Sequence, residues 1–450
     1  MGAAPQAVRA SIARPERCPT PRPGHHGDLR GIRVMLDRTA SSASPGGIQM
    51  DRRRFLKAGT LGALVPGTAR AAAGSAAERG NRVRSYRRLG RTGFEVSDVS
   101  FGSSRLRHGE EHLVHMALDR GINYFDGADS YTGGASETVL GNALKGRRDQ
   151  VYLVSKTKSW AGTRRAELDA ALEASLRRLQ TDYVDVYLNH AVNDVDRLTN
   201  PEWGEFVERA RAAGKIRATG LSGHAGHLIP CLDHAIDHDL ADVVLVAYNF
   251  GQDPAFYEQF TRGFDYVAKQ PDLPRVLDKA KRNDVGVVTM KTLMGARLND
   301  MRPYEDGGAT FAQAAFRWVL SNPNVDALVI SMTERALIDE YLGASGATAV
   351  TARDVDLLRH YARLNGTSYC RHACNDCAGA CPYGVPIAEV LRTRMYATDY
   401  EDAAFARSEY RALEVDAAAC LGCSGEPCRD ACSHGLPVTE LCAPTHRLLA

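Results

Sequence analysis

The sequence lacks a hydrophobic run of the roughly 20 residues that a helix needs to cross a bilayer, so we predict no membrane span. It also lacks an excess of positive charge in its main part. Residues 1–71 hold twelve of the 56 Lys and Arg but only four of the 54 Asp and Glu, which leaves the rest with a net charge of −6. Because nucleic-acid binding needs clustered positive charge, this composition argues against a nucleic acid partner.

Cysteine is almost absent from the first 369 residues, where only Cys18 and Cys231 occur. Eight of the eleven cysteines lie between residues 370 and 432. Such crowding indicates one local site rather than a general feature of the composition. Cys18, Cys231 and Cys442 stand apart from the crowd, and we expect them to take no part in that site.

The first 80 residues differ in composition from the rest. Residues 1–49 are rich in Ala, Arg, Pro, Gly and Ser without apolar periodicity, so we expect a disordered basic extension. Residues 50–80 contain Arg52 and Arg53, a short apolar stretch, and a small-x-small site at 69–71, in the order that export signals require. This order resembles a twin-arginine signal and predicts an exported, periplasmic or extracytoplasmic protein that the twin-arginine translocase carries. The alternative is a basic disordered arm.

From residue 81 to 346 apolar runs alternate with amphipathic segments, of which 164–178 and 309–321 have helical spacing. A hairpin is expected over 86–96. Eight strands are then expected at 98–102, 122–126, 151–156, 183–189, 216–222, 242–248, 286–291 and 326–331. Eight strand–helix units over about 260 residues are what a (β/α)8 TIM barrel requires. A doubly wound sheet is the competitor, but no Gly-x-Gly-x-x-Gly follows an early strand.

Three polar residues fall at the carboxyl ends of consecutive predicted strands, and a tyrosine lies in the adjoining loop. Asp126 ends the second strand, Tyr131 lies in the loop after it, Lys156 ends the third strand, and His190 ends the fourth. In a TIM barrel these ends share one rim, where catalytic residues gather. Each residue alone has an ordinary structural explanation, but four on one rim predict a catalytic site.

These four residue types together suit proton transfer to a carbonyl oxygen. A phenol has an ordinary pKa near 10, and a neighbouring ammonium lowers it by favouring the phenolate. We therefore expect Lys156 to lower the pKa of Tyr131, Asp126 to hold Lys156, and His190 to hydrogen-bond the substrate. The hydride that such a reaction needs comes from a cofactor.

The string GINYFDGADSYTGGASETVLG around Asp126 and Tyr131 resembles the signature of the aldo/keto reductase family. LVSKT, YVDVYLNH, GKIRATGLSGH and VVTMKTLMGA resemble its later blocks in the same order, over about 85–345. This resemblance implies an oxidoreductase that interconverts a carbonyl and an alcohol on a small-molecule substrate. It also implies an NAD(P) cofactor, which Ser222 and Lys291 would approach.

The chain departs from the family pattern where the cofactor would lie. Leu245 replaces a common Gln, Met290 stands where an aromatic ring often stacks on nicotinamide, and Gly223 follows Ser222 in place of Asn. Thr333 falls where the family often has the Arg that meets the extra phosphate of NADP.

The carboxyl-terminal region, 347–450, is expected to form a helical linker and a small cysteine-rich domain. Its two cysteine runs, with cysteines two to four residues apart, resemble those of bacterial ferredoxins and of the aldo/keto reductases that carry such a tail. Because the fourth cysteine of each run ligates the other cluster in two-cluster ferredoxins, the resemblance implies one or two 4Fe-4S clusters. The implied ligand sets are Cys370, Cys374, Cys377 and Cys432 for one cluster, and Cys381, Cys420, Cys423 and Cys428 for the other.

Two alternatives for these cysteines stay open, namely zinc binding and disulfides. For the whole chain, the main prediction is an enzyme whose clusters relay electrons, with a possible electron-transfer partner. The alternative is a non-catalytic barrel that senses redox state or binds a ligand.

Overall fold

The computed structural model describes residues 81–224, 227–251, 272–293, 301–305, 308–365, 370, 376–398 and 403–450. The extension predicted over 1–49, the export signal predicted over 50–80 and Cys374 lie outside the described residues. The fold described below begins with the strand that starts at Tyr86.

A two-stranded antiparallel hairpin precedes the barrel, as predicted. Its strands are β1 (Tyr86–Leu89) and β2 (Phe94–Ser97). Leu89, Phe94 and Val96 are buried in one cluster with side chains from the barrel interior, such as Tyr124 and Val154. The hairpin therefore closes one end of the barrel with apolar side chains and leaves the other end for chemistry.

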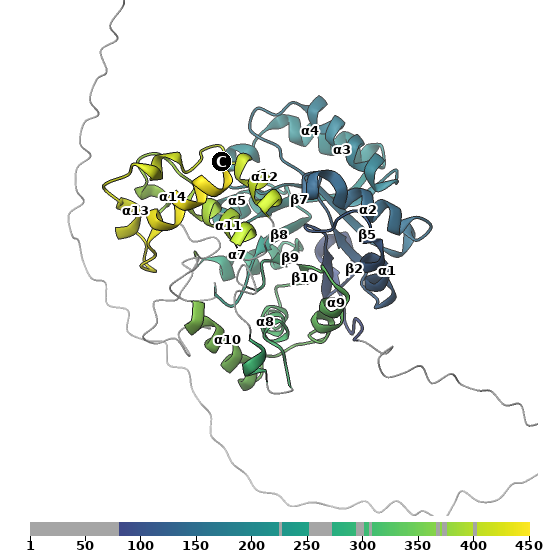
Figure 1. Ribbon diagram of the computed structural model, residues 1–450. Helices are drawn as coiled ribbons and strands as arrows, with labels where there is room; N and C mark the ends of the chain where they lie inside the picture. The colour runs from purple at the N-terminus through teal and green to yellow at the C-terminus, as the bar shows by residue number, and fades with distance from the viewer. Residues whose placement is uncertain are drawn as a thin grey trace, which may run out of the picture. The chain divides into compact units, whose positions relative to one another are not determined.

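Eight parallel strands form a closed barrel in which β10 pairs with β3, which confirms the predicted (β/α)8 architecture (Figure 1). Near-continuous burial along these strands is typical of parallel sheets that are covered on both faces. The strands are β3 (Val99–Gly102), β4 (Tyr124–Asp126), β5 (Tyr152–Thr157), β6 (Val184–Asn189), β7 (Ile216–Gly223), β8 (Val243–Ala247), β9 (Gly286–Met290) and β10 (Ala327–Ser331).

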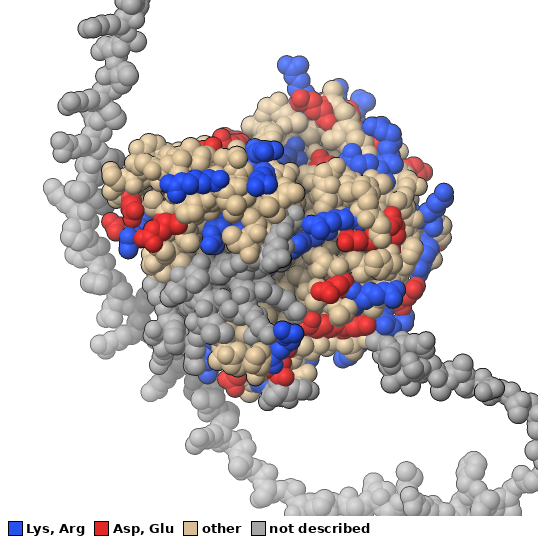
Figure 2. All heavy atoms as spheres, viewed as in Figure 1, with Lys and Arg blue, Asp and Glu red and all other residues tan. Residues whose placement is uncertain are grey.

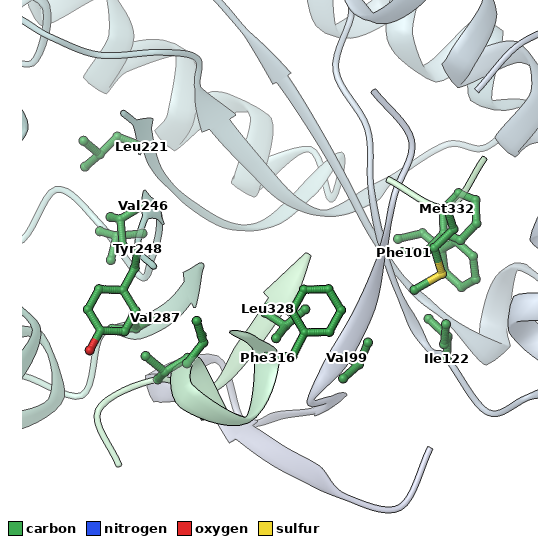
Figure 3. Packing of buried hydrophobic residues seen from close by; sticks show 14 of the residues in the cluster. Val99, Phe101, Ile122, Leu221, Val246, Tyr248, Val287, Phe316, Leu328 and Met332 are labelled. Carbon is green, nitrogen blue, oxygen red and sulfur yellow. The ribbon is translucent and has the colours of Figure 1, made fainter. Parts of the chain in front are cut away.

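Helices cover the outside of the barrel. They are α1 (Glu111–Asp119), α2 (Ala135–Leu144), α3 (Arg165–Leu179), α4 (Pro201–Ala212), α5 (Leu228–Asp237), α7 (Leu273–Arg282), α8 (Phe311–Leu320) and α9 (Arg335–Leu342). Figure 3 shows one example of their packing, with Phe316 of α8 beside Leu328 of β10. The start of α8 is set by Thr310, whose hydroxyl accepts from the Gln313 amide in a capping box.

The residues after the barrel are helical. Helix α10 (Ala352–Asn365) packs on α8, where Arg317 and Asp354 form an ion pair of 2.9 Å. The cysteine-rich region contains α11 (Ile387–Thr398), α12 (Ala403–Arg411), α13 (Pro427–Asp430) and α14 (Val438–Leu449) around its own buried cluster. Over the described part of 376–450 the domain has helices and no strand, so the cysteine-rich domain is a helical one.

Basic and acidic side chains are interspersed on the face drawn in Figure 2. Several ion pairs link neighbouring helices, for example the pair of Arg275 on α7 with Asp233 on α5, at 2.7 Å. Within the part of the chain that the structure describes, no helix combines the length and the apolar character that crossing a membrane demands.

The close packing of β7 against β8 depends on Gly220. A Cβ atom there would lie 1.8 Å from the carbonyl oxygen of Val243, which neither strand can relieve without moving its backbone. We expect Gly220→Ala to lower the free energy of unfolding by at least about 3 kcal/mol, the upper part of the range for overpacked cores. Gly204→Ala is the control, because nothing lies within 4 Å of a Cβ at that helical position. Urea unfolding of both variants checks this, and equal stabilities would contradict it.

Candidate active site

The centre of the predicted site is the side chain of Lys156 at the end of β5. Its Nζ lies 2.8 Å from Oδ2 of Asp126, 2.6 Å from the carbonyl oxygen of Gly127 and 3.1 Å from Oη of Tyr131. An ammonium has three donors, so each donor has one acceptor. Lys156 is fully buried, and Asp126 is 3 % exposed. The structure thus brings together Asp126, Tyr131 and Lys156 from two neighbouring strands and the loop between them.

The phenol of Tyr131 accepts a hydrogen bond from Lys156, which leaves its own proton free to be donated into the cavity. Burial, and then the charge of Asp126, raise the pKa of Tyr131 well above 10. The expectation that Lys156 lowers this pKa is therefore wrong for the protein alone, because desolvation of the phenolate outweighs the ammonium. Tyr131 is held as the neutral acid, which is the form that protonates an oxygen.

His190 faces Tyr131 from the end of β6. The two rings meet edge to face, with their centroids 5.6 Å apart. Burial, together with Lys156 and Lys158, lowers the pKa of His190 well below 6.5, so the imidazole is neutral. Its Nδ1 is buried and has no hydrogen-bond partner among the described residues. A neutral imidazole beside the phenol is suited to hydrogen-bonding a substrate oxygen without competing for its proton.

The four predicted catalytic residues line one cavity of about 340 Å³. Ser222 and Lys291, which the resemblance places near the cofactor, line the same cavity. So do three positions at which the sequence departs from the family, namely Leu245, Met290 and Thr333. The backbone of Lys291 has a positive φ of 57°, a conformation that non-glycine residues rarely adopt outside functional sites.

The sequence did not predict that the cysteine-rich region would contribute to this cavity. Arg392, Tyr396 and Glu409 line it together with the barrel residues. Arg392 donates to Glu389 at 2.7 Å and to the Tyr396 hydroxyl at 2.9 Å, and the Lys291 ammonium lies 3.5 Å from the same hydroxyl. Although burial opposes ionisation, Lys291 and Arg392 lower the pKa of Tyr396.

A second histidine, His224, joins the two regions. Its Nδ1 lies 3.3 Å from Oε1 of Glu389 on α11. Burial disfavours charge on Glu389, but His224 and Arg392 hold the pKa of this carboxyl well below its ordinary value. In the sequence, His224 stands out only as the last residue of the block GKIRATGLSGH. Its pairing with Glu389 could not be predicted, because Glu389 lies 165 positions later.

Four of the predicted cluster ligands line one small cavity: Cys381, Cys420, Cys423 and Cys428. No group of three or more Cys, His, Asp or Glu among the described residues is arranged to hold a single metal ion. Of the other predicted ligand set, Cys370, Cys377 and Cys432 belong to the same buried cluster of the domain.

Cys442, which the sequence analysis expected to take no part in the site, contacts Cys420, one of the residues that line this cavity. It is fully buried on α14. A hydrogen bond between the thiols of Cys420 and Cys442 lowers the pKa of Cys420 to about 7. Only the fold shows this contact, because Cys442 lies in no cysteine run.

The neutral state of His190 makes a prediction about stability and pH. Its pKa is lower in the folded chain than the unfolded value of 6.5, so the unfolded chain binds the proton first and stability falls as the pH drops through about 6.5. We expect His190→Gln to remove part of this slope, up to about 1.4 kcal/mol per pH unit. Urea unfolding between pH 5 and 8 checks this, with the exposed His112→Gln as the control. Identical slopes for the protein and His190→Gln would contradict it.

Comparisons with known proteins identify the family of the chain. The model of the aldo/keto reductase family matches residues 107–303. The chain is 30% identical to methylglyoxal reductase YeaE of Escherichia coli (strain K12) over 226 residues, which cover 49% of this chain and 74% of that one. It is 35% identical to the aldo-keto reductase YhdN of Bacillus subtilis (strain 168) over 155 residues, covering 30% and 46%.

A solved structure of an aldo/keto reductase from Klebsiella pneumoniae, in complex with NADP and acetate, is 26% identical, with a TM-score of 0.49 and coverage of 63% of this chain and 95% of that one. The match to YeaE spans most of that relative. The residues matched by the family model include β4, β5 and β6. The chain therefore belongs to the aldo/keto reductase family and is an oxidoreductase of that type.

Proposed function

We propose that the protein reduces a carbonyl to an alcohol, or the reverse, with a nicotinamide coenzyme held at the mouth of the barrel. The observation that carries this proposal is the buried contact of 3.1 Å between Nζ of Lys156 and Oη of Tyr131, with Oδ2 of Asp126 2.8 Å from the same ammonium. A buried ion pair is costly to maintain. Here the Lys156 ammonium of that pair also donates to Tyr131, whose phenol lines a cavity.

The cavity fits the nicotinamide end of such a coenzyme. Leu245, Met290 and Val329 supply an apolar wall for the ring, while Ser222 and Lys291 supply polar groups at its edge. NADP, which is bound in the Klebsiella pneumoniae structure, is the coenzyme we propose. The coenzyme would supply the hydride that no side chain supplies.

The residues of the chain perform the proton transfer and the positioning. The substrate carbonyl oxygen would accept hydrogen bonds from Tyr131 and His190, which fixes the orientation of the carbonyl carbon. As negative charge develops on that oxygen, the phenol donates its proton, and the adjacent Lys156 ammonium stabilises the phenolate that remains. Asp126 keeps Lys156 charged in a buried environment that would otherwise favour the neutral amine.

The experiment is to mix the purified protein with NADPH and a three-carbon carbonyl compound such as methylglyoxal, and to follow NADPH consumption together with alcohol formation. Stoichiometric consumption of one NADPH per alcohol supports the proposal. Absence of turnover with NADPH and with NADH, across aldehydes and ketones of increasing size, would refute it and favour the non-catalytic sensing barrel.

We also propose that the cysteine-rich domain holds one or two 4Fe-4S clusters. The support is the convergence of Cys381, Cys420, Cys423 and Cys428 on one cavity, although Cys381 is 39 residues before Cys420 in the sequence. Four thiols that line one cavity could each bind one iron of an inorganic core. A cluster supplies one-electron transfer when bound, and this is the electron relay that we infer for the domain.

This second proposal gives a direct prediction. Anaerobically purified protein is expected to contain iron and acid-labile sulfide in equal amounts, and Cys423→Ser to lose both from the site that contains Cys381. Cys231→Ala is the control, because Cys231 is buried in the barrel on α5. Iron and sulfide analysis checks this. Zinc in place of iron, or a colourless protein without sulfide, would contradict it.

We further propose export by the twin-arginine route, and a domain division into 1–49, 50–80, 81–346 and 347–450. The support is the order of Arg52, Arg53, the apolar stretch and the small-x-small site. This route exports folded proteins, which suits a protein that receives its cofactor before it leaves the cytoplasm. Fractionation of cells that express either the unmodified protein or Arg52→Lys/Arg53→Lys tests this proposal. The double variant is expected to stay in the cytoplasm, and equal export of the two proteins would refute the proposal.

A further inference from the structure

A second cavity adjoins the catalytic one. It has a volume of about 660 Å³ and lies between barrel loops and the cysteine-rich domain. His190, His224, Arg392 and Glu409 line both cavities, so the two cavities adjoin at these side chains. Because His190 borders both, the second cavity offers space for the rest of a molecule whose carbonyl reaches Tyr131.

The wall of this second cavity contains an aromatic platform. Trp160 lines it and is 38 % exposed. The loop is fixed, because the Trp160 amide donates to Thr163 and its carbonyl oxygen accepts from Asn200 at 2.9 Å. The guanidinium of Arg197 stacks on the indole, 4.3 Å from the ring centroid.

Arg197 holds the platform and is not itself a ligand-binding cation. Its donors are bonded to the carbonyl oxygens of Ser159, Ala191 and His190 and to the side chain of Asn189. With this contact in place, Trp160 still keeps 38 % of its surface exposed at the cavity that it lines. The platform is therefore built into the loop before any ligand binds.

The charged groups around the second cavity nearly cancel. Its charged lining consists of three cations (Lys158, Arg197 and Arg392) and four carboxylates (Asp194, Glu389, Glu409 and Glu414). Two of the cations are occupied, Arg197 by backbone and Arg392 by carboxylates. Such a lining offers no concentrated charge to an anion, and it offers many hydrogen-bonding groups to a neutral polar molecule.

We propose that this cavity binds the non-reacting part of the substrate, and that this part is an uncharged, polyhydroxylated ring such as a sugar. Such a ring has an apolar face, which stacks on Trp160, and an edge of hydroxyls, which Lys158, Asn193 and Glu414 meet. Oδ1 of Asn193 accepts from the His227 amide at 2.7 Å, which orients its amide group at the wall. The inference rests on the proposed carbonyl chemistry for the neighbouring cavity and extends it to a substrate class.

The test is a binding measurement that needs no turnover. Methyl β-D-glucopyranoside has no carbonyl group, so its binding to the full-length protein can be followed by calorimetry and by fluorescence. The fluorescence reports mainly Trp160, because Trp203 and Trp318 are 6 % and 5 % exposed. We expect saturable binding, weaker binding of glucose 6-phosphate and of methyl β-D-glucuronide, and weaker binding of cyclohexanol.

Two variants locate the site. Trp160→Ala is expected to raise the Kd for the glucoside about tenfold, as loss of one aromatic contact would. Asn193→Ala is expected to raise it severalfold through a different interaction. Tyr304→Ala removes an aromatic ring that is 44 % exposed and lines neither cavity, so the Kd should not change.

Several outcomes overturn the inference. They are no saturable binding of the glucoside, tighter binding of either charged analogue or of cyclohexanol, and an unchanged Kd in both Trp160→Ala and Asn193→Ala. Methylglyoxal reduction by the unmodified protein is measured on the same samples. Turnover of methylglyoxal without sugar binding rejects the substrate class alone, whereas sugar binding without turnover of any carbonyl rejects the proposed function alone.

Discussion

Tyr131→Phe is expected to lower kcat/KM for carbonyl reduction by about 10²- to 10⁴-fold, the usual contribution of a positioned general acid. The substitution removes only the hydroxyl that accepts from Lys156 and keeps the ring that meets His190. The loss should therefore appear in kcat, with KM changed much less. Steady-state kinetics with NADPH and methylglyoxal, together with a thermal unfolding curve, measure both.

Tyr124→Phe is the matched control for this experiment. Tyr124 begins β4, is fully buried, and has a hydroxyl with no hydrogen-bond partner among the described residues. Tyr124→Phe also removes one phenolic oxygen, but from β4 rather than from the loop after it, and Tyr124 does not line the cavity, so kcat should be retained. A Tyr131→Phe variant that turns over as fast as Tyr124→Phe would show that another group supplies the proton.

Lys156→Met is expected to abolish measurable reduction and to cost about 3–5 kcal/mol of stability, because it leaves the buried carboxylate of Asp126 without its partner. The stability loss should shrink at low pH, where Asp126 takes up a proton. Burial raises the pKa of this carboxyl even with Lys156 present, and removing the ammonium raises it further. Urea unfolding at two pH values measures this.

The double variant Lys156→Met/Asp126→Leu separates stability from catalysis. Replacing both members of a buried ion pair with apolar residues is often neutral or stabilising, so most of the stability should return. The activity should not return, because the phenolate of Tyr131 would have no ammonium beside it. A double variant that regains reduction would contradict the role given to Lys156.

The strands could be predicted from sequence because a parallel barrel buries both faces of each strand. That burial makes runs such as LVSK and DVYLN continuous and easy to delimit. The four rim residues followed from strand order alone, since parallel strands place their carboxyl ends together. The roles given to Ser222 and Lys291 came instead from the resemblance to a family, and the cavity includes both.

What the sequence did not predict depends on contacts between distant segments. Arg392 and Tyr396 lie on a helix of the cysteine-rich region. No local pattern shows that they reach a cavity whose lining begins at Gly102, 290 positions before Arg392. The pKa of Tyr131 was predicted in the wrong direction for the same reason. A short motif is enough to predict an ammonium near Tyr131. Burial raises the pKa of Tyr131 more than an ammonium lowers it, and that burial depends on every segment packed around the phenol.

Hydride transfer beside the phenol of Tyr131 is tested most directly with NADPH that carries deuterium at the transferable position. The reduced product is analysed by mass spectrometry and NMR after reaction in ordinary water. The account predicts one deuterium on the former carbonyl carbon and a solvent-derived proton on the oxygen. A product that carries only solvent hydrogen on that carbon would show that electrons and protons arrive separately, and would contradict the account.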